Sequence, residues 1–216
     1  MNWTKYLVEF IGSFFIVSTV GMTIIRPGDA GNLAPLAIGS VLMVMVYAGR
    51  HVSGAHYNPA VTLAMFVRGK CPMADVMPYM VMQILGAVAA SYLVMFIKSF
   101  PPMTPAVIDN PAKVLLVEFV FTFAFCYVFL NVTTSEATAG NSYFGLAIGF
   151  TVTAGMYAVG PVSIGVFNPA VAVGIAILGV TLQINLWIYV AASLAAAIVA
   201  AISFKLINSG NQTDTS

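Results

Sequence analysis

Charged residues are scarce in this chain. Of 216 residues, eight are Lys or Arg and seven are Asp or Glu, so the charged share is 7% and the net charge is +1. Soluble domains carry about 25% charged residues, and this chain therefore cannot cover a water-facing surface. The near-neutral balance also leaves no basic patch for nucleic acid. We expect an integral membrane protein, in keeping with a hydrophobic share of 60% and a mean hydropathy of +0.97.

Cysteine and histidine are rare as well, with two residues of each. Cys71 and Cys126 lie far apart and lack metal-ligand spacing, so we expect neither a disulfide nor a metal site. His51 and His56 have no Cys or Asp beside them to complete a metal-ligand set. No plausible pair of nucleophile and base occurs in the apolar segments. We therefore predict no cofactor and no enzymatic activity.

What the chain does have is long apolar runs. A bilayer core about 30 Å thick needs about 20 apolar residues per helix. Six such segments are predicted to span the membrane, at 4–25, 33–49, 74–97, 113–133, 142–160 and 182–207. The first lacks a small-residue cleavage site, so we interpret it as a span and not as a signal peptide. Two apolar pieces, 58–67 and 168–178, are too short to span, and the polar tail 208–216 is predicted to be disordered.

Several short motifs recur in the chain at one constant offset. The sequence NPAV occurs at 58–61 and 168–171, and LAIG occurs at 36–39 and 146–149, in both cases 110 residues apart. The sequence VEF recurs at an offset of 109. Such a register indicates two homologous halves, which we place at 1–107 and 108–207. Each half has three spans and one short helix.

An odd number of spans per half fixes the topology. The second half must enter the membrane from the opposite side to the first, which makes the chain an inverted repeat. With both termini in the cytoplasm, five basic residues of loops and helix ends lie inside and three lie outside, a bias of the expected sign. The sequence predicts an all-α, multi-pass protein with cytoplasmic termini, and we expect it in the cell membrane in contact with lipid.

Each Asn-Pro-Ala motif has the pattern of a helix start. Asparagine favours the N-cap and proline favours the first helical position. The motifs Asn58-Pro59-Ala60 and Asn168-Pro169-Ala170 thus predict two half-helices, each about 15 Å long at 1.5 Å per residue. Together they match the thickness of one bilayer core, so their N-termini are predicted to meet near the midplane. Each Asn amide is expected to cap its own helix and to aim its NH₂ group into a lumen.

The loops before the two motifs must also lie at membrane depth. Irregular backbone is tolerated there only if it is buried in protein or lines a water-filled cavity. We therefore expect these loops to line a pore with their carbonyl groups. The residues concerned are Gly54, Ala55, His56 and Tyr57 in the first half and Ile164, Gly165 and Val166 in the second. Two positive helix ends would favour neutral solutes and oppose cations.

The paired motifs, the segment SGAHYNPAVT and the acidic residues in the first and fourth spans resemble the aquaporin, or major intrinsic protein, family. The resemblance covers about residues 4–207. It implies six spans with two re-entrant half-helices, one pore per subunit and a homotetramer. It also implies that Glu9 and Glu118 brace the two re-entrant loops by accepting hydrogen bonds from them.

The resemblance also locates a selectivity filter, whose positions can be counted from the motifs. They fall on Ile38, Met156, Gly165 and Val171. Water-selective members of the family usually have an aromatic residue, a His, a small residue and an Arg there, and glycerol facilitators usually keep the Arg. Without these bulky polar groups, we expect a wider and more apolar filter that Met156 or dewetting can gate.

The function predicted from the sequence is a passive channel for water and small uncharged solutes. Glycerol, urea, ammonia, hydrogen peroxide and neutral metalloid hydroxides are the candidate solutes. An alternating-access transporter is an alternative, because inverted repeats and broken helices also occur in that class. A junction or structural protein with a closed pore is a further alternative. Saturable ion-coupled flux would favour the transporter, and absence of flux would favour the structural protein.

Overall fold

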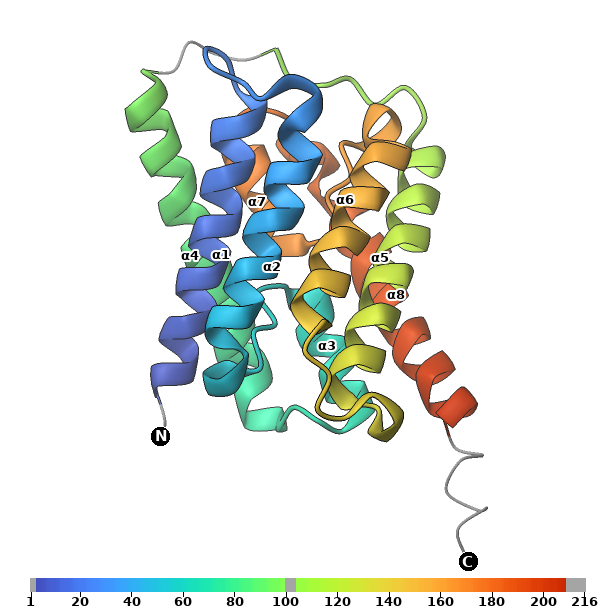
Figure 1. Ribbon diagram of the computed structural model, residues 1–216. Helices are drawn as coiled ribbons and strands as arrows, with labels where there is room; N and C mark the ends of the chain where they lie inside the picture. The colour runs from blue at the N-terminus through green and yellow to red at the C-terminus, as the bar shows by residue number, and fades with distance from the viewer. Residues whose placement is uncertain (1–2, 100–103, 209–216) are drawn as a thin grey trace, which may run out of the picture.

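The computed structural model describes residues 3–99 and 104–208, and within these residues the protein is a bundle of helices (Figure 1). The eight α-helices are α1 (Trp3–Ile24), α2 (Ala34–Ser53), α3 (Pro59–Arg68), α4 (Met73–Lys98), α5 (Pro111–Thr134), α6 (Phe144–Ser163), α7 (Pro169–Ile177) and α8 (Leu186–Asn208). Three short 3-10 turns, Gly31–Leu33, Glu136–Thr138 and Gln183–Asn185, join them. All except α3 and α7 are long and apolar enough to cross a membrane, as predicted.

Two spans end three to four residues beyond their predicted C-terminal ends. Helix α2 continues to Ser53 and so includes His51, which lies beyond the predicted end of that span at residue 49, and α6 continues to Ser163. Each ends at a residue in the left-handed region, Gly54 at φ 89° and Ile164 at φ 75°. The predicted ends were placed where the apolar run stops. A residue in the left-handed conformation ends a helix independently of polarity, so both helices continue through a more polar turn. Of the predicted disordered tail, residue 208 ends α8 and 209–216 lie outside the described residues.

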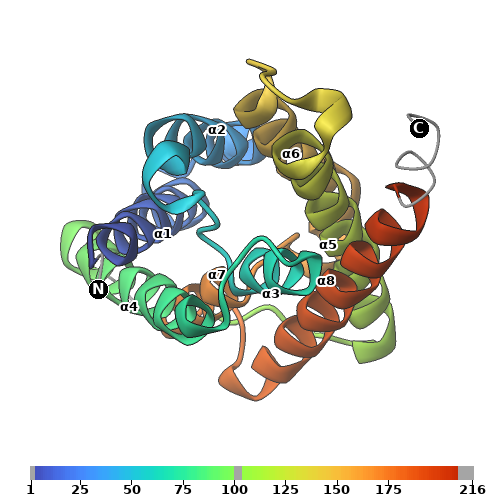
Figure 2. The same ribbon diagram turned by 90° about the horizontal axis from the view of Figure 1, so that it is seen from below.

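The two halves of the chain enter the bundle from opposite ends. Helix α1 begins and α8 ends at one end of the bundle, which we call the terminal side, whereas α5 begins at the other end, the distal side (Figure 1). The short helix α3 lies in the terminal half and α7 in the distal half (Figure 1). Seen along the bundle, α1, α2 and α4 lie on one side of the centre and α5, α6 and α8 on the other (Figure 2).

Glycines allow the helix backbones to touch where they cross. A Cβ atom added to Gly149 of α6 would lie 2.4 Å from the carbonyl oxygen of Gly39 in α2. A Cβ atom added to Gly86 of α4 would lie 2.4 Å from the carbonyl oxygen of Phe10 in α1. Lipid is as apolar as these helices, so close packing of small residues is the main attraction available between them.

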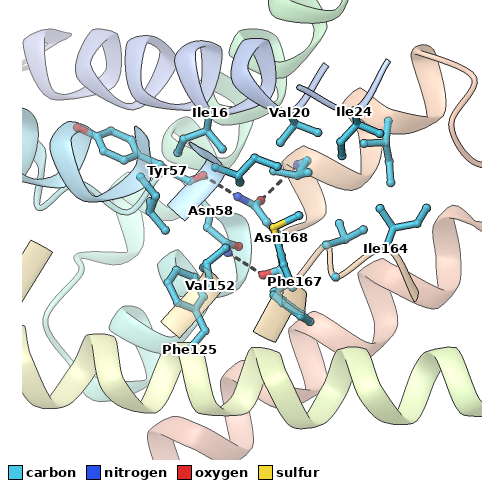
Figure 3. Close-up of a pocket in the computed structure, with 17 residues that line it drawn as sticks. Ile16, Val20, Ile24, Tyr57, Asn58, Phe125, Val152, Ile164, Phe167 and Asn168 are labelled. Carbon is cyan, nitrogen blue, oxygen red and sulfur yellow. Dashed lines mark hydrogen bonds between the residues drawn. The ribbon is translucent and has the colours of Figure 1, made fainter. Parts of the chain in front are cut away.

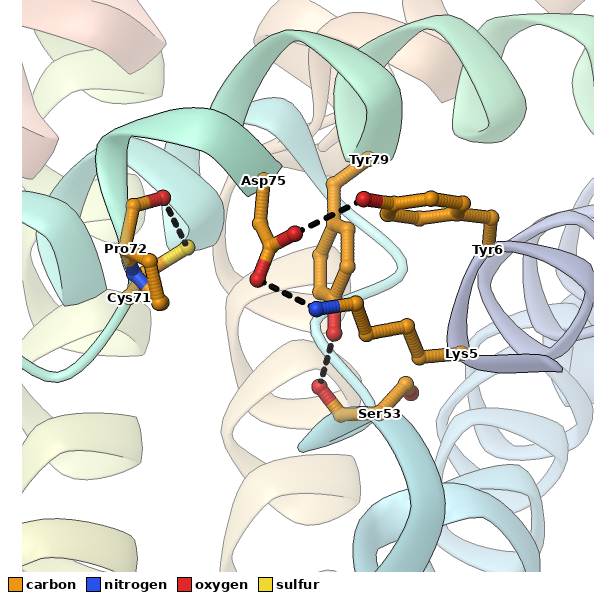
Figure 4. A network of polar contacts seen from close by, with 7 residues as sticks. All are labelled: Lys5, Tyr6, Ser53, Cys71, Pro72, Asp75 and Tyr79. Atoms are coloured by element: carbon orange, nitrogen blue, oxygen red, sulfur yellow. Dashed lines mark hydrogen bonds and ion pairs between the residues drawn. The ribbon is translucent and has the colours of Figure 1, made fainter. Parts of the chain in front are cut away.

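Polar side chains tie the helix ends on both sides. On the terminal side, Asp75 of α4 accepts hydrogen bonds from Lys5 Nζ at 2.5 Å and from Tyr6 Oη at 2.8 Å (Figure 4). Tyr79 Oη donates to the carbonyl oxygen of Ser53 at 2.7 Å, which ties α4 to the end of α2.

On the distal side, Lys98 Nζ donates to three carbonyl groups at and just beyond the end of α1, those of Met22, Ile25 and Pro27. The last carbonyls of a helix have no partner within it, so this lysine satisfies groups that lipid could not.

Candidate functional site

Asn58 and Asn168 cap the two short helices. Both residues have extended backbone, and Pro59 and Pro169 take the first helical positions. Asn58 Oδ1 accepts from the backbone N–H of Ala60 at 2.8 Å, and Asn168 Oδ1 accepts from that of Ala170 at 2.9 Å. The side-chain oxygen thus satisfies one of the N–H groups that a helix start leaves unpaired. This local geometry is the one that the Asn-Pro-Ala pattern predicts.

The two caps also bond to each other's loop. Asn58 Nδ2 donates to the carbonyl oxygen of Phe167 at 2.9 Å, and Asn168 Nδ2 donates to that of Tyr57 at 3.0 Å (Figure 3). An amide NH₂ group has two hydrogens, so each Asn uses one on the opposite loop and has a second to donate elsewhere. The two helix N-termini therefore meet at the centre of the bundle with their positive ends close together.

The loop before α3 is held by one buried carboxylate. Glu9 of α1 accepts from the backbone N–H groups of His56 at 3.0 Å and Tyr57 at 2.6 Å. It also accepts from Ser53 Oγ at 2.7 Å and Gln83 Nε2 at 2.8 Å. Tyr57 has a φ of 51°, an unfavourable value for a residue with a side chain. Hydrogen bonds to a carboxylate are stronger than neutral ones and hold this loop in its strained conformation.

Glu118 has the same relation to the loop before α7. It is fully buried in α5 and accepts from the backbone N–H groups of Val166 at 2.9 Å and Phe167 at 2.8 Å. Phe167 has a φ of 49°, close to the value at Tyr57 in the first loop. Both acids therefore occupy the position that bracing of a re-entrant loop requires.

The first loop has a further polar network that sequence reasoning missed. His56 Nδ1 lies 3.1 Å from Thr62 Oγ1, and Gln83 Nε2 donates to the same hydroxyl at 3.0 Å. At the offset of 110 residues, the second half has Ala172 where the first has Thr62. The network therefore belongs to the first half alone, and a search for matching residues in the two halves could not reveal it.

A cavity of about 40 Å³ lies on the distal side of the two asparagines (Figure 3). This volume accommodates a few water molecules. Its lining is mainly aliphatic, and the polar side chains of Asn58 and Asn168 lie at its inner end. All four residues counted as filter positions line it, namely Ile38, Met156, Gly165 and Val171.

The other residues predicted to line the pore do not all lie in this cavity. Tyr57, Ile164 and Val166 also line this cavity. Gly54 lines a second cavity on the terminal side, and Ala55 and His56 are buried and line neither of these two cavities. The Pro and Ala of each motif are buried in the first turn of their helix, behind the asparagine. The asparagines and the second loop therefore make more of this cavity than the first loop does.

Comparison with known proteins identifies the family. The family described as Major intrinsic protein matches residues 1–204 of the chain. The chain belongs to the major intrinsic protein family. It is a passive transmembrane channel for water and small solutes and not an enzyme. These comparisons do not favour the alternating-access transporter.

Relatives within the major intrinsic protein family include proteins from plants and bacteria. The chain is 35% identical to Aquaporin NIP1-4 of Oryza sativa subsp. japonica, over 96% of this chain and 78% of the relative. It is also 35% identical to Glycerol uptake facilitator protein-like 6 of Lactiplantibacillus plantarum, over 95% of this chain and 98% of the relative. The fold is similar to that of the aquaglyceroporin from Plasmodium falciparum, with a TM-score of 0.79 at 17% identity and full coverage of both chains.

The lining of this family member's cavity also includes residues that the motifs do not locate. Ile16, Val20 and Ile24 of α1 line the cavity. Further lining residues are Leu42, Phe125, Val152, Phe167 and Ile175. The three α1 residues follow one another at intervals of four positions, which places them on one helix face. This spacing is visible in the sequence, but it does not distinguish a pore-facing stripe from a lipid-facing one.

The second cavity is wider and more polar. It has a volume of about 620 Å³ and is lined by Arg50, His51, Lys70 and Glu136 among others. Arg50 Nη2 donates to the carbonyl oxygen of Thr133 at 3.2 Å, and its guanidinium lies 4.4 Å from the centre of the Phe144 ring. The channel thus has a charged, open chamber on the terminal side and an apolar, narrow one on the distal side.

Proposed function

We propose that Ile38, Met156, Gly165 and Val171 form the selectivity filter of this channel, and that the filter passes neutral solutes larger than water as well as water. Their common position in one narrow cavity is the observation that supports this proposal. No charged side chain is among the residues lining the cavity in the described part of the chain. A solute there finds hydrogen-bond partners only on the Asn amides and the loop carbonyls.

The absence of an Arg has two physical effects on permeation. An Arg side chain would narrow the ring and would present fixed donors to each passing solute. Val171 does neither, and Gly165 adds no side chain of its own. Exclusion of larger neutral molecules by width is therefore weaker than it would be with an Arg in the filter, whereas cations still meet two positive helix ends. Glycerol is the first candidate solute, in line with the name of the bacterial relative, and urea is the second.

The remaining features of the channel are proposed with this filter. We propose that Asn58 and Asn168 contact the permeating file and that Glu9 and Glu118 brace the loops around it. The repeats are assigned to 1–107 and 108–207. The protein lies in the cell membrane. Its terminal side faces the cytoplasm, since five of eight basic residues then lie inside. The unit is a homotetramer surrounded by lipid, as the family resemblance implies.

The filter assignment predicts the effect of Val171→Arg. The larger, cationic side chain should reduce glycerol and urea permeability roughly tenfold, which corresponds to about 1.4 kcal/mol of added barrier. Water permeability should fall less, because a single file of water needs the least width. The measurement is paired water and solute flux in proteoliposomes at matched protein density.

Val171→Met is the matched control for this experiment. It lengthens the side chain without adding charge or fixed donors, so it should lower glycerol flux less than Val171→Arg does. Correct folding of both variants is checked by their elution in detergent. If the Arg variant lowers glycerol flux no more than water flux, Val171 does not belong to the filter.

A further inference from the structure

The filter cavity contains one oxidisable side chain. Among the residues that line it in the described ranges 3–99 and 104–208, only Met156 holds a sulfur atom. Met156 packs directly on the loop before α7, since a Cβ atom added to Gly165 would lie 3.1 Å from Met156 Cα and Cγ. Met156 as a whole is 8% exposed. Since Met156 lines the cavity, a small reagent inside the pore can reach it.

We propose that Met156 is a modification site, oxidised to the sulfoxide by small uncharged peroxides that enter the pore, and that this oxidation narrows the range of solutes that the channel passes. The inference rests on the proposed filter. Hydrogen peroxide suits this route, because it is neutral, it hydrogen-bonds as water does and it is only one oxygen atom larger than water.

The reaction needs no partner besides the thioether and the peroxide. A sulfur lone pair of Met156 attacks one peroxide oxygen, an S–O bond forms and the O–O bond breaks. The departing hydroxide takes up the hydrogen that the transferred oxygen loses, and leaves as water. Sulfur is oxidised by two electrons and the peroxide is reduced by two. The product is methionine sulfoxide, which is polar and chiral where methionine was apolar and flexible.

The new oxygen changes the filter in two opposing ways. It adds one heavy atom to a cavity of about 40 Å³ that Ile38 and Val171 also line. It also adds a hydrogen-bond acceptor to a wall that is mainly aliphatic. Water needs little width and gains a partner, whereas glycerol loses width in this cavity. The ratio of glycerol to water permeability should therefore fall on oxidation.

The chain supplies internal references for the oxidation. Met73 and Met77 lie at the start of α4, are 72% and 63% exposed, and do not line the filter cavity. They should react with peroxide before Met156 does, because susceptibility follows exposure. Oxidation of these two residues should leave the permeability ratio unchanged, and the ratio should fall only as Met156 itself becomes oxidised.

The test treats proteoliposomes of saturated phosphatidylcholine with increasing hydrogen peroxide. At each dose, mass spectrometry of peptides gives the oxidised fraction of each methionine, and paired flux assays give the glycerol-to-water ratio. Wild type is compared with Met156→Leu, which keeps a similar volume and cannot be oxidised. The expected result is a severalfold fall of the ratio in wild type that tracks Met156 oxidation, with a constant ratio in Met156→Leu.

A second variant tests the effect of polarity without peroxide. Met156→Gln places a polar side chain of similar length in the filter and should have a lowered ratio from the start. The proposal is overturned if Met156 stays unoxidised while Met73 reacts. It is also overturned if the glycerol-to-water ratio falls equally in wild type and Met156→Leu, or if the ratio is unchanged after most Met156 is oxidised. Untreated wild type with no flux above protein-free vesicles would instead contradict the channel function itself.

Discussion

Replacement of Glu118 by Gln is expected to lower the stability of the protein and to remove most of its water flux. The carboxylate offers one oxygen to the N–H of Val166 and the other to that of Phe167. A glutamine offers one oxygen and one NH₂ group, so a donor faces one of the two N–H groups. A buried donor left without an acceptor costs about 1–3 kcal/mol. The loop that carries Gly165 then loses its position in the filter cavity.

The measurement is thermal unfolding in detergent, followed by water flux in proteoliposomes. Asp109→Asn is the control, because Asp109 is an exposed carboxylate on the loop before α5, and its loss should change neither quantity. Glu9→Gln should act as Glu118→Gln does, since Glu9 holds two backbone N–H groups in the same way. A Glu118→Gln protein that keeps wild-type stability and flux would contradict the bracing role. Loss of a proton-coupled flux in this variant would support a transporter.

Replacement of Asn168 by Asp is expected to let cations through the channel. The carboxylate can still cap α7 by accepting from the N–H of Ala170, so the fold should persist. It can no longer donate to the carbonyl oxygen of Tyr57, and it places a negative charge where two positive helix ends opposed cations. We expect cation conductance to rise by at least about tenfold, equivalent to a barrier lowered by about 1.4 kcal/mol.

Asn110→Asp is a matched control for this experiment. Asn110 is also the N-cap of a helix, α5, where its side chain accepts from the N–H of Lys113, and it is exposed on the distal side. The same chemical change there should leave conductance at the background level. Conductance is measured as the decay of an imposed potassium gradient in vesicles. An Asn168→Asp protein that folds and stays as impermeable to ions as Asn110→Asp would argue against the central position of Asn168.

The fold could be predicted in large part because a membrane imposes simple rules on sequence. Six apolar runs of the right length became six long helices, and the Asn-Pro pairs marked the starts of α3 and α7. Helix ends were predicted less well, since Ile164 takes a left-handed conformation that is unusual for a β-branched residue. Its conformation depends on the hydrogen bonds of the surrounding loop, and no property of isoleucine indicates it.

The candidate site could also be predicted only in part. Counting from the motifs assigned Ile38 and Met156, on two different helices, to the cavity that also holds Val171. The contacts of Lys98 with the end of α1, and of Lys5 with Asp75, join residues about 70 positions apart. Nothing in a single sequence pairs such residues, because each pairing depends on how two helices are rotated against each other. These contacts became visible only in the structure.

The exchange of hydrogen bonds between the two asparagines has a consequence for the order of assembly during synthesis. Asn58 finds its acceptor on residue 167, and Tyr57 finds its donor on residue 168, so neither partner exists while the ribosome is making the first half. The first half therefore enters the membrane with an incomplete polar loop at its centre. Completion of the pore waits until α5 and α6 have crossed and the second motif has followed them. The conducting state is thus among the last parts of the native structure to form, and a chain that stops before α7 has no route to it.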